Sequence, residues 1–408
     1  GEADLARHTE LLSYLQKEGG ADLLSTSIDA NTRRRLYAEA KQGYPDLHGF
    51  PAVNHGLAAC RHLIKSLAVP NQVSRCGADA RLLAEITLAA GFSSFAGGGI
   101  STNIPHTKRV PPAKSLRDWQ YVDRLVGFYQ KRGVALNRET PGSLTGILVA
   151  PCISHSIAII EAVLAAKQGV KSITLSYGQG GHLCQDIAAL QTLPLLARDY
   201  LQQEGLSNVQ ITTAFQQWTG GIPADEAKAY GIICFGALTA VLGGASKVLV
   251  KSTREGQRVP QKEANARAIR ATKQVLNMLR GQVYPESAAL KEEREVIIRE
   301  TRQILAKTLE LGDGDWALGA VRAFAAGVID LPFTPSTYNR GRTLPARDDQ
   351  GAVRFLDCGY LPFSNKDKEF HRSKLAKRGR SEQRTPTFQM VSDDLYASGM
   401  GRLIGRPD

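Results

Sequence analysis

Short runs of strand-forming residues alternate with longer amphipathic helical patterns over roughly the first 250 residues of the chain. This alternation is typical of parallel βα units, in which each helix connects one strand to the next. The expected strands are residues 21–28, 72–76, 91–96, 146–151, 172–177, 210–215 and 247–252. The expected helices between them include residues 82–89, 116–131, 154–168, 183–202 and 225–242. Seven strands at this spacing predict an α/β fold built as a (β/α)8 TIM barrel with one strand not visible in the sequence.

A doubly wound open sheet is the alternative to the barrel. Such a sheet commonly carries a phosphate-binding glycine motif, but no G-x-G-x-x-G follows the first expected strand and no G-x-x-x-x-G-K-[ST] occurs anywhere. The barrel is therefore the preferred fold, and a nucleotide phosphate is not strongly indicated.

The pattern changes twice after the barrel. From Pro260 it becomes purely helical, with helices expected at residues 262–279 and 288–311. From Leu331 onward Pro, Gly, Asn and Arg interrupt every run, and a short strand is expected at Ala352–Leu356. We expect three parts: a barrel catalytic domain, a helical extension and a small α+β C-terminal module. Their expected limits are residues 1–260, 261–330 and 331–408.

Composition excludes several classes of protein. No apolar run approaches the roughly 20 residues that span a bilayer, and the first residues lack the apolar core of a signal peptide, so a cytoplasmic protein is expected. The six cysteines form no C-x-x-C pair and are expected to be reduced and mostly buried. The 51 Lys and Arg exceed the 39 Asp and Glu, and part of the excess gathers in residues 366–384. Without a nucleic-acid-binding motif, this run favours a solvated helix or a surface for an acidic protein, and nucleic acid is an unlikely partner.

Three consecutive glycines, Gly97, Gly98 and Gly99, follow a short apolar run and precede Pro105. Consecutive glycines are favoured where the backbone adopts a positive φ or where another group approaches the main chain closely. The stretch 93–105 therefore predicts a strand end that opens into a functional loop, with a ligand as the approaching group. A flexible surface turn is the alternative, and the glycines alone do not decide between the two.

Charged residues follow the last expected strand. In a (β/α)8 barrel the chemistry lies at the carboxyl ends of the strands. Lys247 and Lys251 are four residues apart, so on one strand their side chains share a face, and Glu255 follows in the loop. Lys251 and Glu255 could bind the hydroxyls of a ribose or similar polyol through charge-assisted hydrogen bonds, or could form an ordinary ion pair.

Arginines and histidines follow other strands. Arg33 and Arg75 lie just after the first two expected strands and suit an anionic substrate such as a carboxylate. His106 follows the glycine loop and is a candidate hydrogen-bond or proton donor, while His48 and His182 stand alone in other loops. The histidines have no metal-ligand spacing, and no Ser/His/Asp arrangement supports hydrolase chemistry.

Several strings of the chain, taken together, match one known family. They are GGAD (19–22), DARLLAE (79–85), GGGIS (97–101), SLRDWQYVDRLVGF (115–128), NRE (137–139), QW (217–218), KEAN (262–265), LGDGD (311–315) and FQMV (388–391). With these strings in the same order from about His8 to Asp408, the chain resembles the large (ε) subunit of adenosylcobalamin-dependent glutamate mutase, also called methylaspartate mutase, as a divergent member.

The resemblance implies a barrel whose mouth is capped by adenosylcobalamin carried on a separate small subunit. That small subunit holds the cobalt ligand in a D-x-H-x-x-G motif, which this chain lacks, so no metal ligand is expected here. It also implies a heteromer that contains a dimer of large subunits and performs a radical carbon-skeleton rearrangement. Lys251 and Glu255 fall on the positions that hold the adenosyl ribose. Other cofactor-contacting positions are Gly1, His48, Pro105, Ile222 and Val259, with His48 in place of the usual Asn.

The substrate side departs from the family pattern. Three arginines form the family's carboxylate claw; Arg33 is retained, Ser74 occupies the second position with Arg75 beside it, and the third would precede Gly1. The other changes are Ala96 for the glutamate that holds the substrate amine, Thr102 and His106 for two tyrosines, and Gln216 for a histidine. Replacing that glutamate by Ala96 removes a charged hydrogen bond, which is worth about 1.5–3 kcal/mol. We therefore expect an altered pocket and a relative of glutamate, amino-acid-like or a plain carboxylic acid, as substrate.

Two alternatives remain open. One is a non-catalytic paralogue that keeps the barrel as a binding or scaffold partner. The other is a cobalamin-independent barrel enzyme that uses His106, Arg75 and Cys76 for polar chemistry. The family's first barrel strand precedes the position of Gly1, and an open barrel has unpaired edges, so an upstream segment is expected in the native protein.

Overall fold

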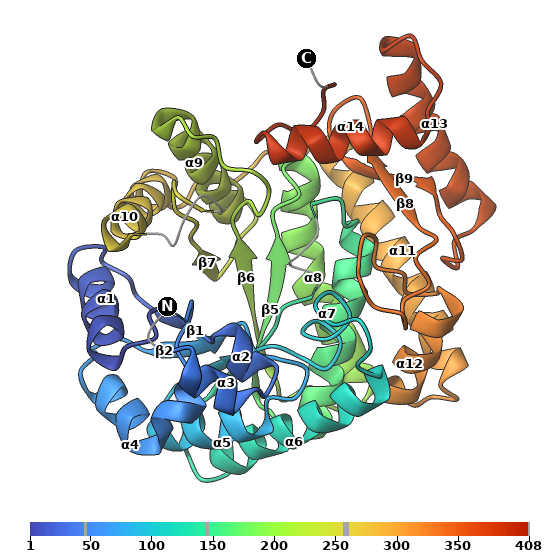
Figure 1. Cartoon of the computed structure of the whole chain (residues 1–408). Helices are drawn as coiled ribbons and strands as arrows, with labels where there is room; N and C mark the ends of the chain where they lie inside the picture. Colours follow the sequence, from blue (N-terminus) through green and yellow to red (C-terminus); the bar gives the residue numbers. More distant parts are fainter. Residues whose placement is uncertain (45–46, 143–146, 256–260, 407–408) are drawn as a thin grey trace.

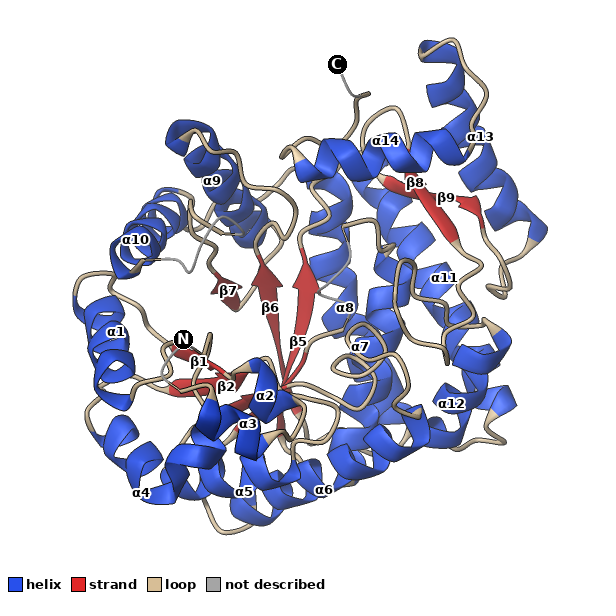
Figure 2. Ribbon diagram, viewed as in Figure 1, coloured by secondary structure: helices blue, strands red, loops and turns tan. Residues whose placement is uncertain are grey.

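The computed structural model describes residues 1–44, 47–142, 147–255 and 261–406 (Figure 1). Its main element is a sheet of seven parallel strands that pair in the order of the sequence. Figure 2 shows these strands curving around a common centre, with helices on the outer side. The parallel βα arrangement predicted from the sequence is therefore confirmed. The strands are β1 (Leu24–Ser27), β2 (Asn71–Ser74), β3 (Ser94–Ala96), β4 (Asn137–Thr140), β5 (Ser172–Gly178), β6 (Gln210–Gln216) and β7 (Lys247–Leu249).

The sheet is an open, curled half-barrel, and the closed (β/α)8 barrel expected from the sequence is not what the structure shows. Among the described residues β1 pairs with β2 and β7 with β6, but β1 and β7 do not pair with each other. Helices α1 (Leu5–Lys17) and α10 (Lys262–Met278) bridge the gap on the outside. Lys273 Nζ on α10 donates to the Gly20 carbonyl at 2.7 Å. The outer layer of helices is therefore continuous across the gap, while the edges of β1 and β7 do not pair among the described residues.

The fourth strand lies at Asn137–Thr140, and the prediction of a strand at residues 146–151 is wrong. The first residue of that range lies outside the described residues, residues 147–150 form a turn and an irregular segment, and Pro151 already begins α7 (Pro151–Lys167). Arg138 and Glu139 concealed the true strand, because charged side chains are rarely buried. Both are 1% exposed here, since they find charged partners from other elements.

Helices cover the convex side of the sheet in two layers on one flank. Helix α7 is buried on nearly all sides because α11 and α12 pack over it and over α8, as Figure 1 shows. The helices other than α1, α7 and α10 are α2 (Ala30–Arg33), α3 (Tyr37–Gln42), α4 (Ala52–Lys65), α5 (Arg81–Ala90), α6 (Pro112–Gln130), α8 (Leu183–Gln203), α9 (Glu226–Leu242), α11 (Ala288–Leu311), α12 (Trp316–Ala326), α13 (Asn365–Ser381) and α14 (Phe388–Gly399).

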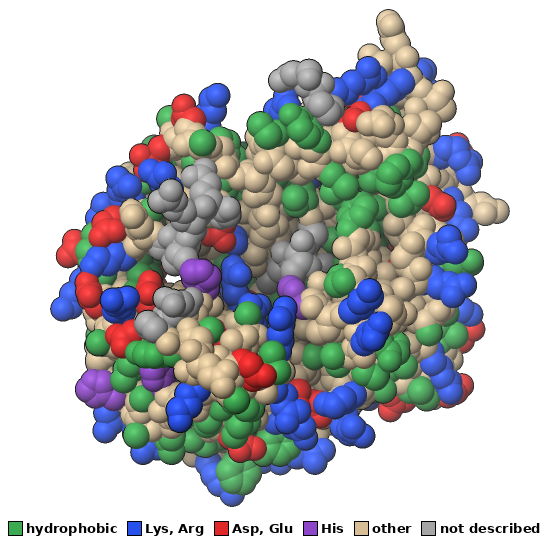
Figure 3. All heavy atoms as spheres, in the orientation of Figure 1, with side chains coloured by type: hydrophobic (Ala, Val, Ile, Leu, Met, Phe, Trp, Pro, Cys, Tyr) green, Lys and Arg blue, Asp and Glu red, His purple; other side chains and the backbone are tan. Residues whose placement is uncertain are grey.

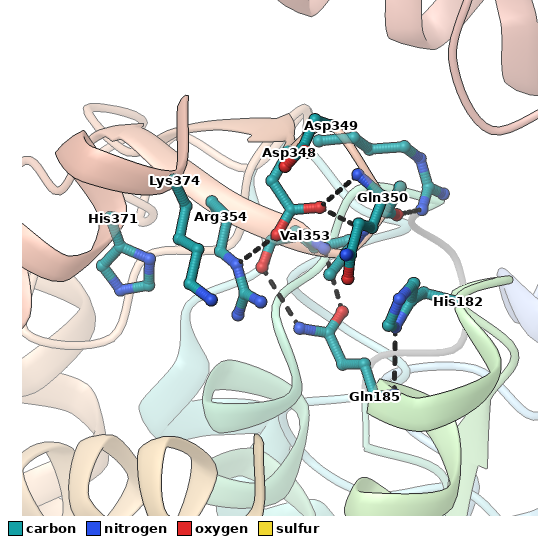
Figure 4. Close-up of polar contacts among 12 residues, drawn as sticks. His182, Gln185, Asp348, Asp349, Gln350, Val353, Arg354, His371 and Lys374 are labelled. Carbon is teal, nitrogen blue, oxygen red and sulfur yellow. Dashed lines mark hydrogen bonds and ion pairs between the residues drawn. The ribbon is translucent and has the colours of Figure 1, made fainter. Parts of the chain in front are cut away.

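A small hairpin with two helices ends the chain. The antiparallel strands β8 (Leu344–Arg347) and β9 (Val353–Asp357) pack against α13 and α14. Figure 4 shows how the hairpin meets the start of α8, where the Val353 N–H donates to Gln185 Oε1 at 2.9 Å. Arg354 donates to Asp348 beside this contact at 2.8 Å. The division into residues 1–260, 261–330 and 331–408 stays a prediction.

None of the helices in the described part of the chain is both long and apolar enough to cross a membrane. The six cysteines are free thiols, five of them buried and Cys234 partly exposed.

Candidate functional site

A cavity of about 2360 Å³ opens on the concave side of the sheet, at the carboxyl ends of the strands. Figure 3 shows basic and histidine side chains gathered around this hollow. Most residues predicted for the site lie together in its wall: Gly1, Arg33, His48, Ser74, Arg75, Ala96, Thr102, His106, Gln216, Lys251 and Glu255. Pro105 and Ile222 are not part of this lining, and Val259 lies outside the described residues.

The glycine loop after β3 packs against the protein itself. A Cβ atom on Gly98 would lie 2.1 Å from the Glu161 carboxylate, and one on Gly99 would lie 2.6 Å from the Leu116 Cα. Gly97 has a φ of 147° and faces Trp119. Because all three glycines are buried, the alternative of a flexible surface turn is wrong. The predicted close approach is real, but the groups that approach Gly98 and Gly99 belong to α7 and α6.

Ser74 and Arg75, which end β2, have different surroundings. Ser74 Oγ accepts a hydrogen bond from Ser25 Oγ at 2.7 Å, so this hydroxyl is engaged between neighbouring strands. Arg75 has a φ of 57°, in the left-handed region that non-glycine residues rarely adopt. This backbone turns the Arg75 side chain toward Glu255, 3.8 Å away. Strain of this kind is common at functional sites, and here it places a guanidinium at the cavity wall.

Arg33 and His106 give the cavity a positive but unevenly charged wall. Arg33 ends α2, whose first turn is capped by the Asp29 carboxylate. Burial, with added repulsion from Arg75, lowers the pKa of the Arg33 guanidinium. Although His106 is exposed at the cavity wall, partial desolvation by the surrounding protein also lowers its pKa, and both arginines lower it further. His106 is thus a neutral hydrogen-bonding group beside two cations, an arrangement that suits an anion.

Lys251 and Glu255 form an ion pair in the cavity wall. Lys251 Nζ lies 3.0 Å from Glu255 Oε1, and the Lys251 N–H donates to Gln217 Oε1 at 2.9 Å. The expected strand ends earlier than predicted, at Leu249, so Lys251 stands in the loop beyond it. The structure therefore confirms the pair, and the geometry is compatible with both roles that the sequence left open.

Cys76 does not suit the polar chemistry considered for a cobalamin-independent enzyme. It lines the cavity, but its thiol is 4% exposed and burial raises its pKa to about 12. The thiol therefore stays protonated at neutral pH, whereas the thiolate is the nucleophile.

A polar cluster at the cavity floor joins Lys247, which the sequence singled out, to partners that the sequence did not predict. Glu139 on β4 accepts hydrogen bonds from Gln72 Nε2 at 2.8 Å and Ser176 Oγ at 2.7 Å, and pairs with Lys247. Lys247 Nζ also donates to Gln72 Oε1 at 2.8 Å. The presence of two adjacent charges in a strand was the available signal. No group of three His, Cys, Asp or Glu in the described part of the chain is suited to hold a metal ion.

A large cavity with charged side chains in its wall, at the strand ends of a curled parallel sheet, is the architecture of an α/β enzyme. A family model described as methylaspartate mutase E chain (MutE) matches residues 1–407. The glutamate mutase epsilon subunit of Desulfitobacterium hafniense is 58% identical over 100% of this chain and 86% of its own length. The proteins of the same name from Treponema denticola and Yersinia enterocolitica are 49% and 48% identical, over 99% and 100% of this chain and 85% and 86% of their own lengths.

The chain therefore belongs to the methylaspartate mutase E chain family. A mutase is an isomerase, so this is a family of isomerases, and the resemblance drawn from the sequence strings is confirmed.

Proposed function

We propose that this chain is the large subunit of an adenosylcobalamin-dependent carbon-skeleton mutase that acts on a carboxylic acid related to glutamate. The observation that carries the proposal is the Lys251–Glu255 pair, which faces the same cavity as Arg33 and Arg75. One half of the cavity would thus hold a cofactor and the other half an anionic substrate.

The Lys251–Glu255 pair fits the sugar of the cofactor. The ammonium of Lys251 and the carboxylate of Glu255 are 3.0 Å apart, a spacing that lets one donate to and the other accept from adjacent hydroxyls. When bound, adenosylcobalamin supplies radical chemistry that amino-acid side chains cannot provide. Gly1 and His48 line the same cavity and are proposed as further contacts. Pro105, Ile222 and Val259 are proposed as contacts on the resemblance alone.

The substrate half is proposed to hold carboxylate groups. Arg33 and Arg75 present guanidinium groups, which bind carboxylates through two parallel hydrogen bonds, and His106 adds a neutral polar group. The hydroxyl of Thr102 is engaged by the Gly98 carbonyl at 2.6 Å, so it supports the wall. Ala96 and Gln216 give the remaining surface no charge of their own. Ser74, held between strands, would contribute shape more than binding.

Assembly and location complete the proposal. The cofactor would be shared with a small cobalamin-binding subunit that carries a D-x-H-x-x-G motif, and two large subunits would form a dimer in the cytoplasm. The unpaired edges of β1 and β7 support closure into a (β/α)8 barrel when an eighth strand lies between them.

Spectroscopy of the assembled protein tests this function. The chain is mixed with a small cobalamin-binding subunit and adenosylcobalamin, and cob(II)alamin is measured by electron paramagnetic resonance after adding glutamate, 2-methylglutarate or other dicarboxylates. We expect a signal with at least one acid and its loss in Lys251→Ala. Lys262→Ala, which removes a surface pair with Glu10, is the control that keeps the signal. The absence of both cofactor binding and any signal in the unmodified protein would overturn the proposal.

A further inference from the structure

We propose that Glu161 on α7 is a positioning residue for the substrate half of the cavity, because it fixes the loop of residues 97–107 that forms one wall. This loop is called the β3 loop below. The inference rests on the proposed function, since it concerns the same cavity. Glu161 itself is not part of the cavity lining, so it acts through the loop.

The carboxylate of Glu161 accepts hydrogen bonds from backbone and side-chain groups near the start of the β3 loop. The N–H groups of Ile100 and Ser101 both donate to Oε1 at 2.8 Å. Ser101 Oγ donates to Oε2 at 2.8 Å. Glu161 is 4% exposed, so water cannot replace these bonds. Gly98 makes the approach possible because it has no Cβ.

The fixed loop in turn contacts the segment that carries Arg75. Thr102 Oγ1 lies 2.6 Å from the Gly98 carbonyl and 3.1 Å from the Gly77 carbonyl, to which Trp119 Nε1 also donates at 3.2 Å. Gly77 is two residues beyond Arg75. At its far end the β3 loop carries His106, whose N–H donates to the Asn103 carbonyl at 3.0 Å. One buried carboxylate thus sets the position of both predicted substrate-binding segments.

Charge is expected to matter as well as shape. A glutamine at position 161 keeps one acceptor oxygen for the two N–H groups, but its amide would face the Ser101 hydroxyl in place of the second oxygen. Burial raises the pKa of Glu161 to about 7, and the charge of Arg138 on β4 opposes this rise. Above that pH the ionised carboxylate accepts all of these bonds, whereas below it one oxygen carries a proton that can be donated to the Ser101 hydroxyl.

The loop after β5 supplies a matched control. There the Asp186 carboxylate accepts the N–H groups of Gly180 and Gly181 at 2.9 and 2.8 Å and is equally buried. Residues 179–181 are not part of the cavity lining. Asp186→Asn therefore weakens a loop of the same construction without altering the cavity wall.

The test measures binding of glutarate, a simple dicarboxylate, to the full chain by calorimetry in the absence of cobalamin, together with amide hydrogen exchange. We expect Glu161→Gln to raise the dissociation constant about tenfold and to speed exchange at Ile100 and Ser101, whereas Asp186→Asn leaves the dissociation constant unchanged. The ratio of the dissociation constants of Glu161→Gln and the unmodified chain should fall toward one as the pH drops from 8 to 6, because protonated Glu161 resembles glutamine. Glu161→Asp, which keeps the charge, should have a dissociation constant between those of Glu161→Gln and the unmodified chain.

Two results overturn different claims. If the unmodified chain binds glutarate and both Glu161 variants bind it equally well at pH 8, Glu161 does not position the site. If the unmodified chain binds neither glutarate nor another dicarboxylate, the proposed anion-binding function fails first.

Discussion

In the β3 loop two backbone N–H groups donate to Glu161, and in the loop after β5 two donate to Asp186. Glu161 lies on α7, the helix after the next strand, β4, whereas Asp186 lies on α8, the helix that directly follows its own loop. Both carboxylates are buried. The two loops differ in what lies in front of them. The β3 loop faces the cavity with Thr102 and His106, whereas the loop after β5 faces the C-terminal hairpin.

An arginine side chain also holds each loop, and the two arginines come from different parts of the chain. Arg138 on β4 donates to the Phe95 carbonyl at 2.6 Å and to the Gly97 carbonyl at 3.1 Å, so the β3 loop is held by the half-barrel itself. Arg347 on β8 donates to the Gly180 carbonyl at 2.7 Å, across a distance of 167 positions in the sequence. The same kind of contact therefore supports a wall of the cavity in one place and holds the C-terminal hairpin in the other.

Loss of the arginine clamps should give the largest effect. Arg138→Met leaves Asp123 buried without its partner and is expected to lower the free energy of unfolding by about 3–5 kcal/mol. Arg347→Met should cost less, about 2–3 kcal/mol, because the Arg347 guanidinium donates to the backbone carbonyls of Gly180 and Gly351, and the nearby Asp394 still pairs with Arg378 at 2.8 Å. Urea denaturation measures both. If Arg347→Met lowers the free energy of unfolding as much as Arg138→Met or more, the different partners of the two arginines do not explain their contributions to stability.

The pH dependence of stability should separate the two carboxylates. Burial raises the pKa of Glu161 from 4.5 to about 7, so between these values the folded chain keeps a proton that the unfolded chain has lost. Its contribution to stability is present below pH 4.5 and is lost as the pH rises through 7, on the order of 3 kcal/mol in total.

Comparison of the unmodified chain with Glu161→Gln isolates this contribution. The difference in the free energy of unfolding should change between pH 4.5 and 7. For Asp186→Asn the window should lie lower, since burial raises the pKa of Asp186 from 3.8 to about 6. Identical windows for the two variants would contradict the assignment.

Glycine substitutions test how closely each carboxylate approaches its loop. Gly98→Ala places a Cβ 2.1 Å from Glu161 and should cost about 2–3 kcal/mol. Gly180→Ala places a Cβ 2.9 Å from Asp186 Oδ1 and should cost about 1 kcal/mol. Thermal or urea unfolding of the two variants checks the order, and a milder effect at Gly98 would mean that α7 can move away.

A pair that belongs to neither loop gives the lower limit. Lys251→Ala breaks the 3.0 Å contact with Glu255 in a partly exposed position, and the expected loss of stability is about 1 kcal/mol or less. The effect on cofactor binding should be far larger than the effect on unfolding. A large loss of stability would assign the pair a structural role in place of the proposed binding role.

The sequence predicted much of the fold and of the site wall. Periodicity located six of the seven strands, and most of the site residues predicted from the strand ends and from the family resemblance line the cavity. The fourth strand was missed because Arg138 and Glu139 are charged, and their burial depends on Asp123, on the preceding helix, and on Lys247, 108 residues away. The glycine triplet predicted a close approach, but only the folded chain shows that Glu161 is the group that approaches Gly98.

By itself the sequence determined the local structure and the membership of the family, because strand and helix periods and motif strings are properties of neighbouring residues. The tertiary structure decided which charges are buried, which carboxylate holds which loop, and that the described strands leave two edges open. Ser101 and Glu161 are 60 residues apart, and Glu139 and Lys247 are 108 apart. Such pairs form only when the sheet curls and brings distant segments into one low-dielectric interior, where an unpaired charge is costly.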